Sequence, residues 1–223
     1  MADVVVFDFD GTVADTMPVC VGAFQHIFRL FDQRYVSERE VIAMFGPPEA
    51  GIITRNLRNR DAVPNAIAEF YRYYSELHNQ TVKPLPGLYE LLVDIKDMGK
   101  RLVVFTGKGR RSLTISLRQL GLDNLFEMAV TGDDVTEKKP NPEGLHLIMR
   151  EFNCGAGDVW MIGDSDADVA AAIRAGVRSV RVEWFPFEFL DFRKTPDDVC
   201  ATIADLRRLL QVPQHHGHNE VAN

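Results

Sequence analysis

Two pairs of aspartates, far apart in a chain of 223 residues, each follow a run of apolar residues. Asp8 and Asp10 come directly after the apolar residues 4–7, and Asp164 and Asp168 come after a second such run. Carboxylates at the end of a buried strand are costly unless they bind a partner. Residues two apart on a strand, or four apart on a helical turn, can face the same way. Each pair is therefore suited to hold a cation, and an oxygen-rich set without His or Cys favours Mg²⁺ over zinc.

Two other segments carry groups suited to phosphate. Thr106 follows an apolar run, and its hydroxyl, with the backbone amides of Gly107 and Lys108, could hold phosphate oxygens near a helix amino terminus. Lys139, which precedes a proline, could balance the charge of carboxylates and phosphate together. Lys138 is equally basic, and either lysine taken alone is better interpreted as a surface residue.

Two partial motif matches point to other chemistry and are weaker. Residues 107–112 nearly match a dinucleotide-binding fingerprint, but Ser112 replaces the last glycine and the segment does not follow the first strand. Residues 163–167 nearly match the nucleophile elbow of an esterase, but they end in Ala167. We assign Asp166, in the same segment, to helix capping and stabilisation of the helix dipole.

The elements that would position these groups alternate along most of the chain. Short apolar runs predict strands at 4–7, 102–105, 127–130, 159–162 and 179–182, and apolar residues three and four apart predict helices between them. Such alternation predicts an α/β fold, a Rossmann-like doubly wound parallel sheet with helices on both faces. Ligands of such sheets bind at the carboxyl edge of the strands, where all four polar segments lie.

A helical block interrupts this alternation after the first strand. Residues 15–83 contain three amphipathic segments and no convincing strand, with a Pro-rich break at 45–49 that either joins helices or points into a site. Two prolines and a glycine at 83–87 mark the return to alternation. We therefore expect a core domain of residues 1–14 and 84–213 and an inserted helical domain of residues 15–83.

The end of the chain predicts one more helix and a polar tail. The helix is expected at about 197–211. Its apolar face is formed by Val199, Ile203, Leu206 and Leu210. Residues 214–223 are expected to be disordered, as terminal segments without apolar residues usually are. Metal binding is the alternative for the three histidines of this tail, His215, His216 and His218.

Composition and charge exclude several classes of function. Hydrophobic residues make up 46% of the chain and charged residues 26%, as in ordinary globular proteins. No apolar run is long enough to span a membrane and no targeting segment begins the chain, so we expect a cytoplasmic protein without a membrane partner. The net charge of −7 disfavours nucleic acid, whereas a small phosphorylated anion can bind an acidic protein through a metal. The three cysteines are expected to be reduced, and the protein to be a monomer or a homodimer.

The nonapeptide from Asp8 to Thr16, Asp-Phe-Asp-Gly-Thr-Val-Ala-Asp-Thr, resembles the first motif of the haloacid dehalogenase (HAD) superfamily of phosphotransferases, in its cap-bearing phosphatase branch. The segments at 106–107, 138–140 and 163–168 follow in the order and approximate spacing of the other three motifs. The resemblance implies that the inserted block is the type 1 helical cap of that family.

The resemblance also implies a role for each matching residue. Asp8 would be the nucleophile, and Asp10 the general acid and base. The metal ligands would be Asp8, the backbone of Asp10 and Asp164, with Asp168 in support. Phosphate would be bound by Gly11, Thr12, Thr106, Gly107, Lys108 and Lys139.

The resemblance therefore predicts a Mg²⁺-dependent phosphatase that acts on a small phosphorylated metabolite through an aspartyl-phosphate. Phosphoglycolate is the best specific substrate, because many relatives take it, and the acid at position 10 separates this chain from the dehalogenases themselves. A phosphomutase of the β-phosphoglucomutase type is the alternative; Arg55 and Arg58 are near enough to the cap's break to leave open a second phosphate site. A non-catalytic binding protein is the third interpretation, although a scaffold gains nothing from clustered buried carboxylates.

Overall fold

A single six-stranded sheet forms the centre of the protein in a computed structural model, which describes residues 3–185 and 193–213. The strands are β1 (Val4–Phe7), β2 (Arg101–Phe105), β3 (Met128–Val130), β4 (Val159–Gly163), β5 (Arg178–Val182) and β6 (Asp198–Cys200). They are all parallel, in the order β3-β2-β1-β4-β5-β6. The predicted α/β fold with a doubly wound parallel sheet is confirmed, and the first strand lies between β2 and β4.

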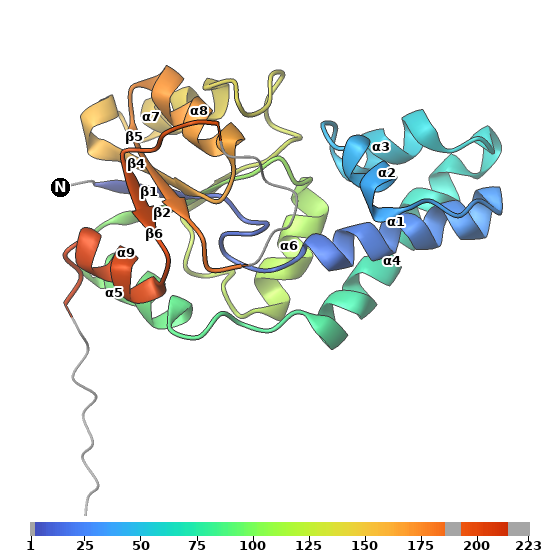
Figure 1. The fold of residues 1–223 in the computed structure, drawn as a ribbon, viewed down its shortest axis with the longest axis horizontal. Coiled ribbons are helices and arrows are strands. Elements are labelled where there is room, and N and C mark those ends of the chain that lie inside the picture. The colour runs from blue at the N-terminus through green and yellow to red at the C-terminus, as the bar shows by residue number, and fades with distance from the viewer. Residues whose placement is uncertain (1–2, 186–192, 214–223) are drawn as a thin grey trace, which may run out of the picture.

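Helices cover both faces of the sheet because successive strand residues point to opposite sides. On β1, Val4 and Val6 pack into one apolar cluster, and Val5 and Phe7 pack into the other. The first cluster lies under α7 (Glu143–Glu151) and α8 (Asp166–Ala175), seen above the sheet in Figure 1. The second lies against α5 (Leu88–Asp97), α6 (Arg110–Gln119) and α9 (Ile203–Leu209), on the other face. A one-turn 3₁₀ helix, Ala156–Asp158, precedes β4.

Four α-helices lie to one side of this sheet, between β1 and α5 in the chain (Figure 1). They are α1 (Met17–Asp32), α2 (Glu38–Ala43), α3 (Glu49–Asn56) and α4 (Val63–Thr81), with a 3₁₀ turn at Arg60–Ala62. Aromatic side chains hold them together, for example Phe24 of α1 against Phe70 of α4, with ring centroids 4.6 Å apart. The hydroxyl of Tyr74 on α4 lies 2.8 Å from Ser116 Oγ on α6, which joins the helices to the core.

The predicted helix at about 197–211 is wrong in its first part. Residues 198–200 form β6, in which Asp198 pairs with Val180 of β5, and α9 begins only at Ile203. Thr202 stops the helix from extending backward, because its hydroxyl accepts from Asp205 N while Asp205 Oδ2 accepts from Thr202 N. Val199, counted on the apolar helix face, is 49% exposed.

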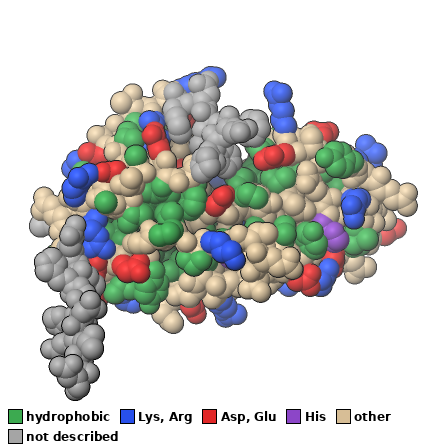
Figure 2. Space-filling view, turned by 60° about the horizontal axis from the view of Figure 1, so that its bottom comes forward, with side chains coloured by type: hydrophobic (Ala, Val, Ile, Leu, Met, Phe, Trp, Pro, Cys, Tyr) green, Lys and Arg blue, Asp and Glu red, His purple; other side chains and the backbone are tan. Residues whose placement is uncertain are grey.

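The structure also bears on the expectations about a membrane partner and about surface charge. Among residues 3–185 and 193–213, no helix has the length and apolar character that a membrane span requires. Acidic and basic side chains are interspersed over the face in Figure 2. The histidine-containing tail, residues 214–223, lies outside the described residues.

Candidate active site

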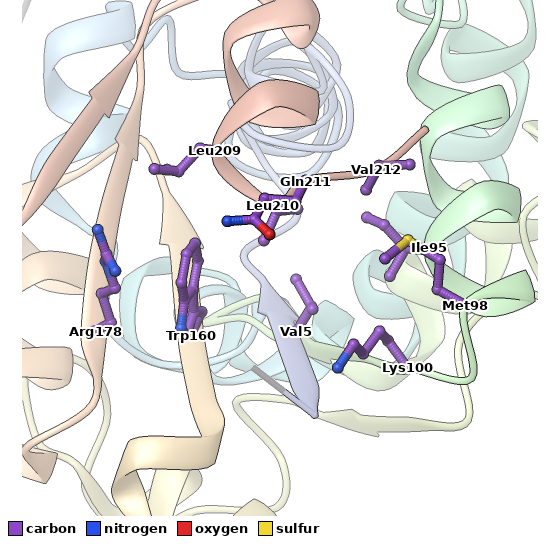
Figure 3. Close-up of a pocket in the computed structure, with 10 residues that line it drawn as sticks. All are labelled: Val5, Ile95, Met98, Lys100, Trp160, Arg178, Leu209, Leu210, Gln211 and Val212. Atoms are coloured by element: carbon purple, nitrogen blue, oxygen red, sulfur yellow. The ribbon is translucent and has the colours of Figure 1, made fainter. Parts of the chain in front are cut away.

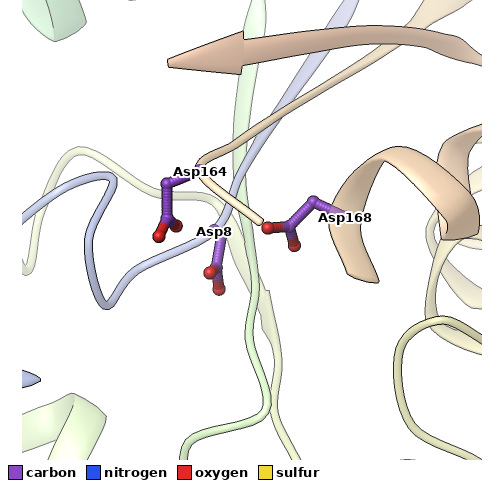
Figure 4. A group of neighbouring side chains, drawn as sticks. All are labelled: Asp8, Asp164 and Asp168. Carbon is purple, nitrogen blue, oxygen red and sulfur yellow. The ribbon is translucent and has the colours of Figure 1, made fainter. Parts of the chain in front are cut away.

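Three aspartates, two at the ends of neighbouring strands and one in the helix that follows, meet at the carboxyl edge of the sheet (Figure 4). Asp8 follows β1, Asp164 follows β4, and Asp168 lies in the first turn of α8. One carboxylate oxygen from each residue lies within 4.8 Å of the others. Because β1 and β4 are paired in the sheet, acids 156 residues apart in sequence reach one point.

Hydrogen bonds hold two of these carboxylates in place. Thr12 Oγ1 donates to Asp164 Oδ1 at 2.9 Å. The backbone N and hydroxyl of Ser165, the N-cap of α8, donate to Asp168 Oδ2 at 3.0 and 2.5 Å. Thr12, which we expected to bind phosphate, thus uses its hydroxyl to orient Asp164, and its side chain is fully buried.

Gly11 has two reasons to be glycine. Its φ is +80°, in the left-handed region, and a Cβ built on it would overlap the carboxylate of Asp164. Gly99 is a matched control, because its φ of +73° is similar but no atom lies within 4 Å of its Cβ position.

We therefore expect Gly11→Ala to disturb the site and Gly99→Ala only the backbone. Gly99→Ala should lower the free energy of unfolding by about 1 kcal/mol. Gly11→Ala should lower it further and weaken Mg²⁺ binding at least about tenfold, because Asp164 must move. Urea unfolding and calorimetric titration with Mg²⁺ measure the two effects. Equal Mg²⁺ affinity in both variants would contradict the close approach.

A buried lysine pairs with two of the three aspartates. Lys139 Nζ lies 2.8 Å from Asp8 Oδ1 and 2.6 Å from Asp168 Oδ1, and it donates to the carbonyl of Phe105 at 3.1 Å. Burial alone would lower the pKa of Lys139, but Asp168 and Asp8 outweigh it and the pKa is raised. Lys139 therefore neutralises part of the carboxylate charge, as its predicted role requires.

One lysine does not balance three carboxylates. Burial raises the pKa of Asp8 to about 7, opposed by Lys139 and reinforced by Asp168. Burial also raises the pKa of Asp164 to about 8, and Asp8 adds to the shift. Both shifts disfavour the charged form of these buried carboxyls, and a hard divalent cation would stabilise that form. The all-oxygen donors fit Mg²⁺ by their chemistry.

Asp10 belongs to a second ion pair, next to the first. Lys108 Nζ donates to Asp10 Oδ1 at 2.9 Å, and the hydroxyl of Thr16 donates to the same oxygen. The Lys108 side chain is 1% exposed, and its Nζ lies 4.8 Å from the ring centroid of Tyr74 on α4. We predicted a phosphate contact from the Lys108 backbone, and the sequence carried no signal for this contact of its side chain with Asp10.

The remaining predicted residues lie at the same edge. Thr106 is buried, and its Oγ1 accepts from Lys108 N at 3.2 Å. A cavity of about 300 Å³ opens between this edge and residues of α1, α3 and the 45–49 break. Seven predicted site residues line it, namely Asp8, Asp10, Thr106, Gly107, Lys108, Lys139 and Asp164. Gly11, Thr12 and Asp168 lie behind that lining.

The Pro-rich break at 45–49 points into this cavity, which settles an alternative that the sequence left open. Its last residue, Glu49, is 4% exposed, and its Oε2 accepts from Gly109 N at 3.1 Å. Its Oε1 accepts from the hydroxyl of Ser112 on α6. Sequence reasoning missed Glu49, because an acid at the start of a helix is usually explained by the helix dipole.

A second cavity, of about 320 Å³, lies near the amino ends of the strands (Figure 3). Trp160, Arg178 and Lys100 line it, and the Arg178 guanidinium stacks over the Trp160 ring at 4.4 Å. Arg178 also donates to Asp198 at 2.7 Å. None of the three clustered aspartates lines this cavity, so the cavity at the carboxyl edge is the candidate site.

Comparison with known proteins adds an independent finding. A haloacid dehalogenase-like hydrolase family model matches residues 5–182. The chain is 28% identical over 212 residues to pyrophosphatase PpaX of Halalkalibacterium halodurans, covering 93% of this chain and 96% of that one. A crystal structure of a predicted phosphoglycolate phosphatase from Haemophilus somnus is similar with a TM-score of 0.81 and 23% identity, over 94% of this chain and 98% of that one. CbbY from Rhodobacter sphaeroides, in complex with phosphate, has a TM-score of 0.79 and 23% identity, over 92% and 96%.

Proposed function

Since the chain belongs to the haloacid dehalogenase-like hydrolase family, we propose that it is a Mg²⁺-dependent phosphatase of small phosphorylated metabolites. The observation that carries this proposal is the meeting of Asp8, Asp164 and Asp168 with Lys139 at a cavity of about 300 Å³. Phosphoryl transfer needs in-line placement and charge neutralisation more than elaborate covalent steps. This arrangement can supply both.

In the proposed reaction a carboxylate oxygen of Asp8 attacks phosphorus and the bond to the leaving alkoxide breaks. Asp10 gives its proton to that alkoxide and then takes a proton from water, which attacks the aspartyl-phosphate and releases inorganic phosphate. Mg²⁺, held by Asp8, the backbone of Asp10 and Asp164, would reduce the repulsion between carboxylate and phosphate.

The other residues of the site position these groups. Lys139 holds Asp8 and, with Thr106 and Gly107, is proposed to bind the transferred phosphate. Lys108 and Thr16 orient the Asp10 carboxylate. We propose that residues 15–83 act as a cap that would exclude water, because residues of α1, α3 and the 45–49 break line the cavity opposite the carboxylates.

Two substrate classes are supported. Phosphoglycolate remains the best single phosphate ester from the resemblance of the motifs. The 28% identity to proteins named pyrophosphatase PpaX favours inorganic pyrophosphate as a second candidate. A panel of phosphate esters and pyrophosphate, assayed for phosphate release with and without Mg²⁺, tests the proposal. Absence of Mg²⁺-dependent release across the panel would reject it in favour of a binding protein.

A phosphomutase of the β-phosphoglucomutase type stays the alternative activity. A phosphomutase must hold a second phosphate, which calls for basic residues in the inserted helices. The four residues of the 45–49 break that precede Glu49 carry no charge, and Arg55 on α3 is exposed. Isomerisation of a sugar phosphate without release of inorganic phosphate would favour the mutase.

Mg²⁺ binding should strengthen as the pH rises. The folded-state pKa values of Asp8 and Asp164 are raised from 3.8 to about 7 and about 8, so protons compete with the cation below those values. The metal-free fold binds more protons than the unfolded chain between about pH 4 and 8, so its stability falls as pH rises through that interval. We expect the rise in Tm on adding Mg²⁺ to be larger at pH 8.5 than at pH 6. An equal rise in Tm at the two pH values would contradict the raised pKa values of Asp8 and Asp164.

A further inference from the structure

One amine in the cavity has no role in the proposed reaction. Lys138 lines the cavity, and its Nζ is buried with no hydrogen-bond partner among residues 3–185 and 193–213. Lys108 and Lys139, which line the same cavity, each pair with at least one aspartate. Burying an ammonium group without a partner is costly, so a ligand that supplies an anion is the expected compensation.

Lys138 and its neighbour Lys139 interact with different charged groups. Lys139 contacts Asp8 and Asp168, the carboxylates at the sheet edge. The charged groups that act on Lys138 are instead Arg55 and Glu49 of α3 and Asp133 of the loop after β3. Lys138 therefore lies close enough to α3, across the cavity lining, to interact with its charged residues.

The acids near Lys138 are already hydrogen-bonded elsewhere. Glu49 accepts from Gly109 N and from the Ser112 hydroxyl, and Asp133 Oδ2 accepts from Arg110 N at 2.8 Å. Burial first, and then the positive charge of Arg55, lower the pKa of Lys138. An anion bound beside Lys138 would offset both effects.

We propose that Lys138 forms a subsite for a second anionic group of the substrate, a carboxylate or a phosphoryl group a few atoms from the phosphorus that is attacked. This inference rests on the proposed function, which assigns the first phosphate to the Lys139 side. A cavity of about 300 Å³ is at the small end of ligand pockets, so the subsite selects short, doubly anionic molecules over neutral phosphate esters.

Binding of non-hydrolysable phosphonates tests the subsite without turnover. The ligands each carry one phosphonate and differ in the second group. That group is a carboxylate in 3-phosphonopropionate and a second phosphonate in ethane-1,2-diphosphonate, and propylphosphonate has no second anion. Calorimetric titration of the full-length protein with Mg²⁺ gives the ratio of Kd values between propylphosphonate and each doubly anionic ligand. We expect wild-type protein to favour at least one doubly anionic ligand by about tenfold or more.

The variant Lys138→Gln should reduce that ratio to below about threefold. Lys83→Gln removes the same charge at an exposed lysine outside the cavity and should keep the wild-type ratio. The ligand that loses its advantage identifies the second anion as a carboxylate or a phosphoryl group. No preference in the wild-type protein, or a preference that survives in Lys138→Gln, overturns the inference.

A parallel assay of phosphate release keeps the two proposals separate. A preference that depends on Lys138, without release from any ester or pyrophosphate, would reject the phosphatase and keep the subsite. Release of phosphate without such a preference would do the reverse.

Discussion

Asp8→Asn is expected to abolish hydrolysis of p-nitrophenyl phosphate, with a loss of at least about 10³-fold in kcat. The amide cannot attack phosphorus, and it cannot bring a negative charge to the cation. The fold should survive, because the substitution removes one of three crowded carboxylates while Lys139 keeps its contact with Asp168. The expected result is thus a folded, inactive protein whose Tm in EDTA is not lowered.

Two further variants sharpen this result. Asp97→Asn, at an exposed position in α5, changes the same charge away from the site and should keep full activity. Asp10→Asn should cripple turnover without abolishing Mg²⁺ binding, because only its backbone is assigned to the metal. Normal turnover by Asp8→Asn would refute the nucleophile, whatever the other two variants do.

Lys139→Met is expected to have the largest effect on stability. It leaves Asp8 and Asp168 buried without the ammonium group that contacts both at under 3 Å. Removing one partner from a buried ion pair costs about 3–5 kcal/mol of unfolding free energy. Urea unfolding at pH 8 in EDTA measures this cost, and phosphate release should be lost as well.

The pH dependence and a neighbouring lysine provide the controls. Lys139 is the main group that lowers the pKa of Asp8, so its removal raises that pKa further. At pH 5.5 Asp8 is protonated in the folded state with or without Lys139, whereas at pH 8 only the wild-type protein holds it charged beside an ammonium group, so the cost of the substitution should be smaller at pH 5.5 than at pH 8. Lys138→Met removes an amine that has no hydrogen-bond partner among the described residues, and it should be far less destabilising. Equal losses for the two lysines would contradict the buried pairing.

Much of the fold followed from local patterns. The apolar runs before Asp8, Thr106 and Asp164 predicted β1, β2 and β4, because buried parallel strands have apolar side chains on both faces. The prediction of the final helix was wrong in its first part because the local pattern there was ambiguous. Val199 lies four residues before Ile203, a spacing that suits one face of a helix, and only the pairing of residues 198–200 with β5 shows that it belongs to a strand.

The residues of the candidate site likewise fall into those that the sequence predicted and those that it missed. Residue type and position at strand ends were enough to select Asp8 and Asp164, because an α/β sheet brings its strand ends to one edge. Lys139 was selected only by the resemblance of its segment to a family motif. Glu49 and Lys138 carried no comparable signal. The hydrogen bonds of Glu49 join the inserted helices to Gly109 and to Ser112 of α6, and Lys138 lines the same cavity. No spacing in the sequence specifies how two such units meet.

The sequence by itself indicated which carboxylates would gather, since the alternation of strands and helices is a local pattern and parallel strands end at one edge. Only the tertiary structure decided which charge each of them faces. Side-chain packing pairs Lys108 with Asp10, and Lys139 with Asp8 and Asp168, across 29 or more residues of chain. The same packing leaves Lys138 Nζ without a hydrogen bond among the described residues. Electrostatic energy depends on distance and burial, and neither can be read from position along the chain.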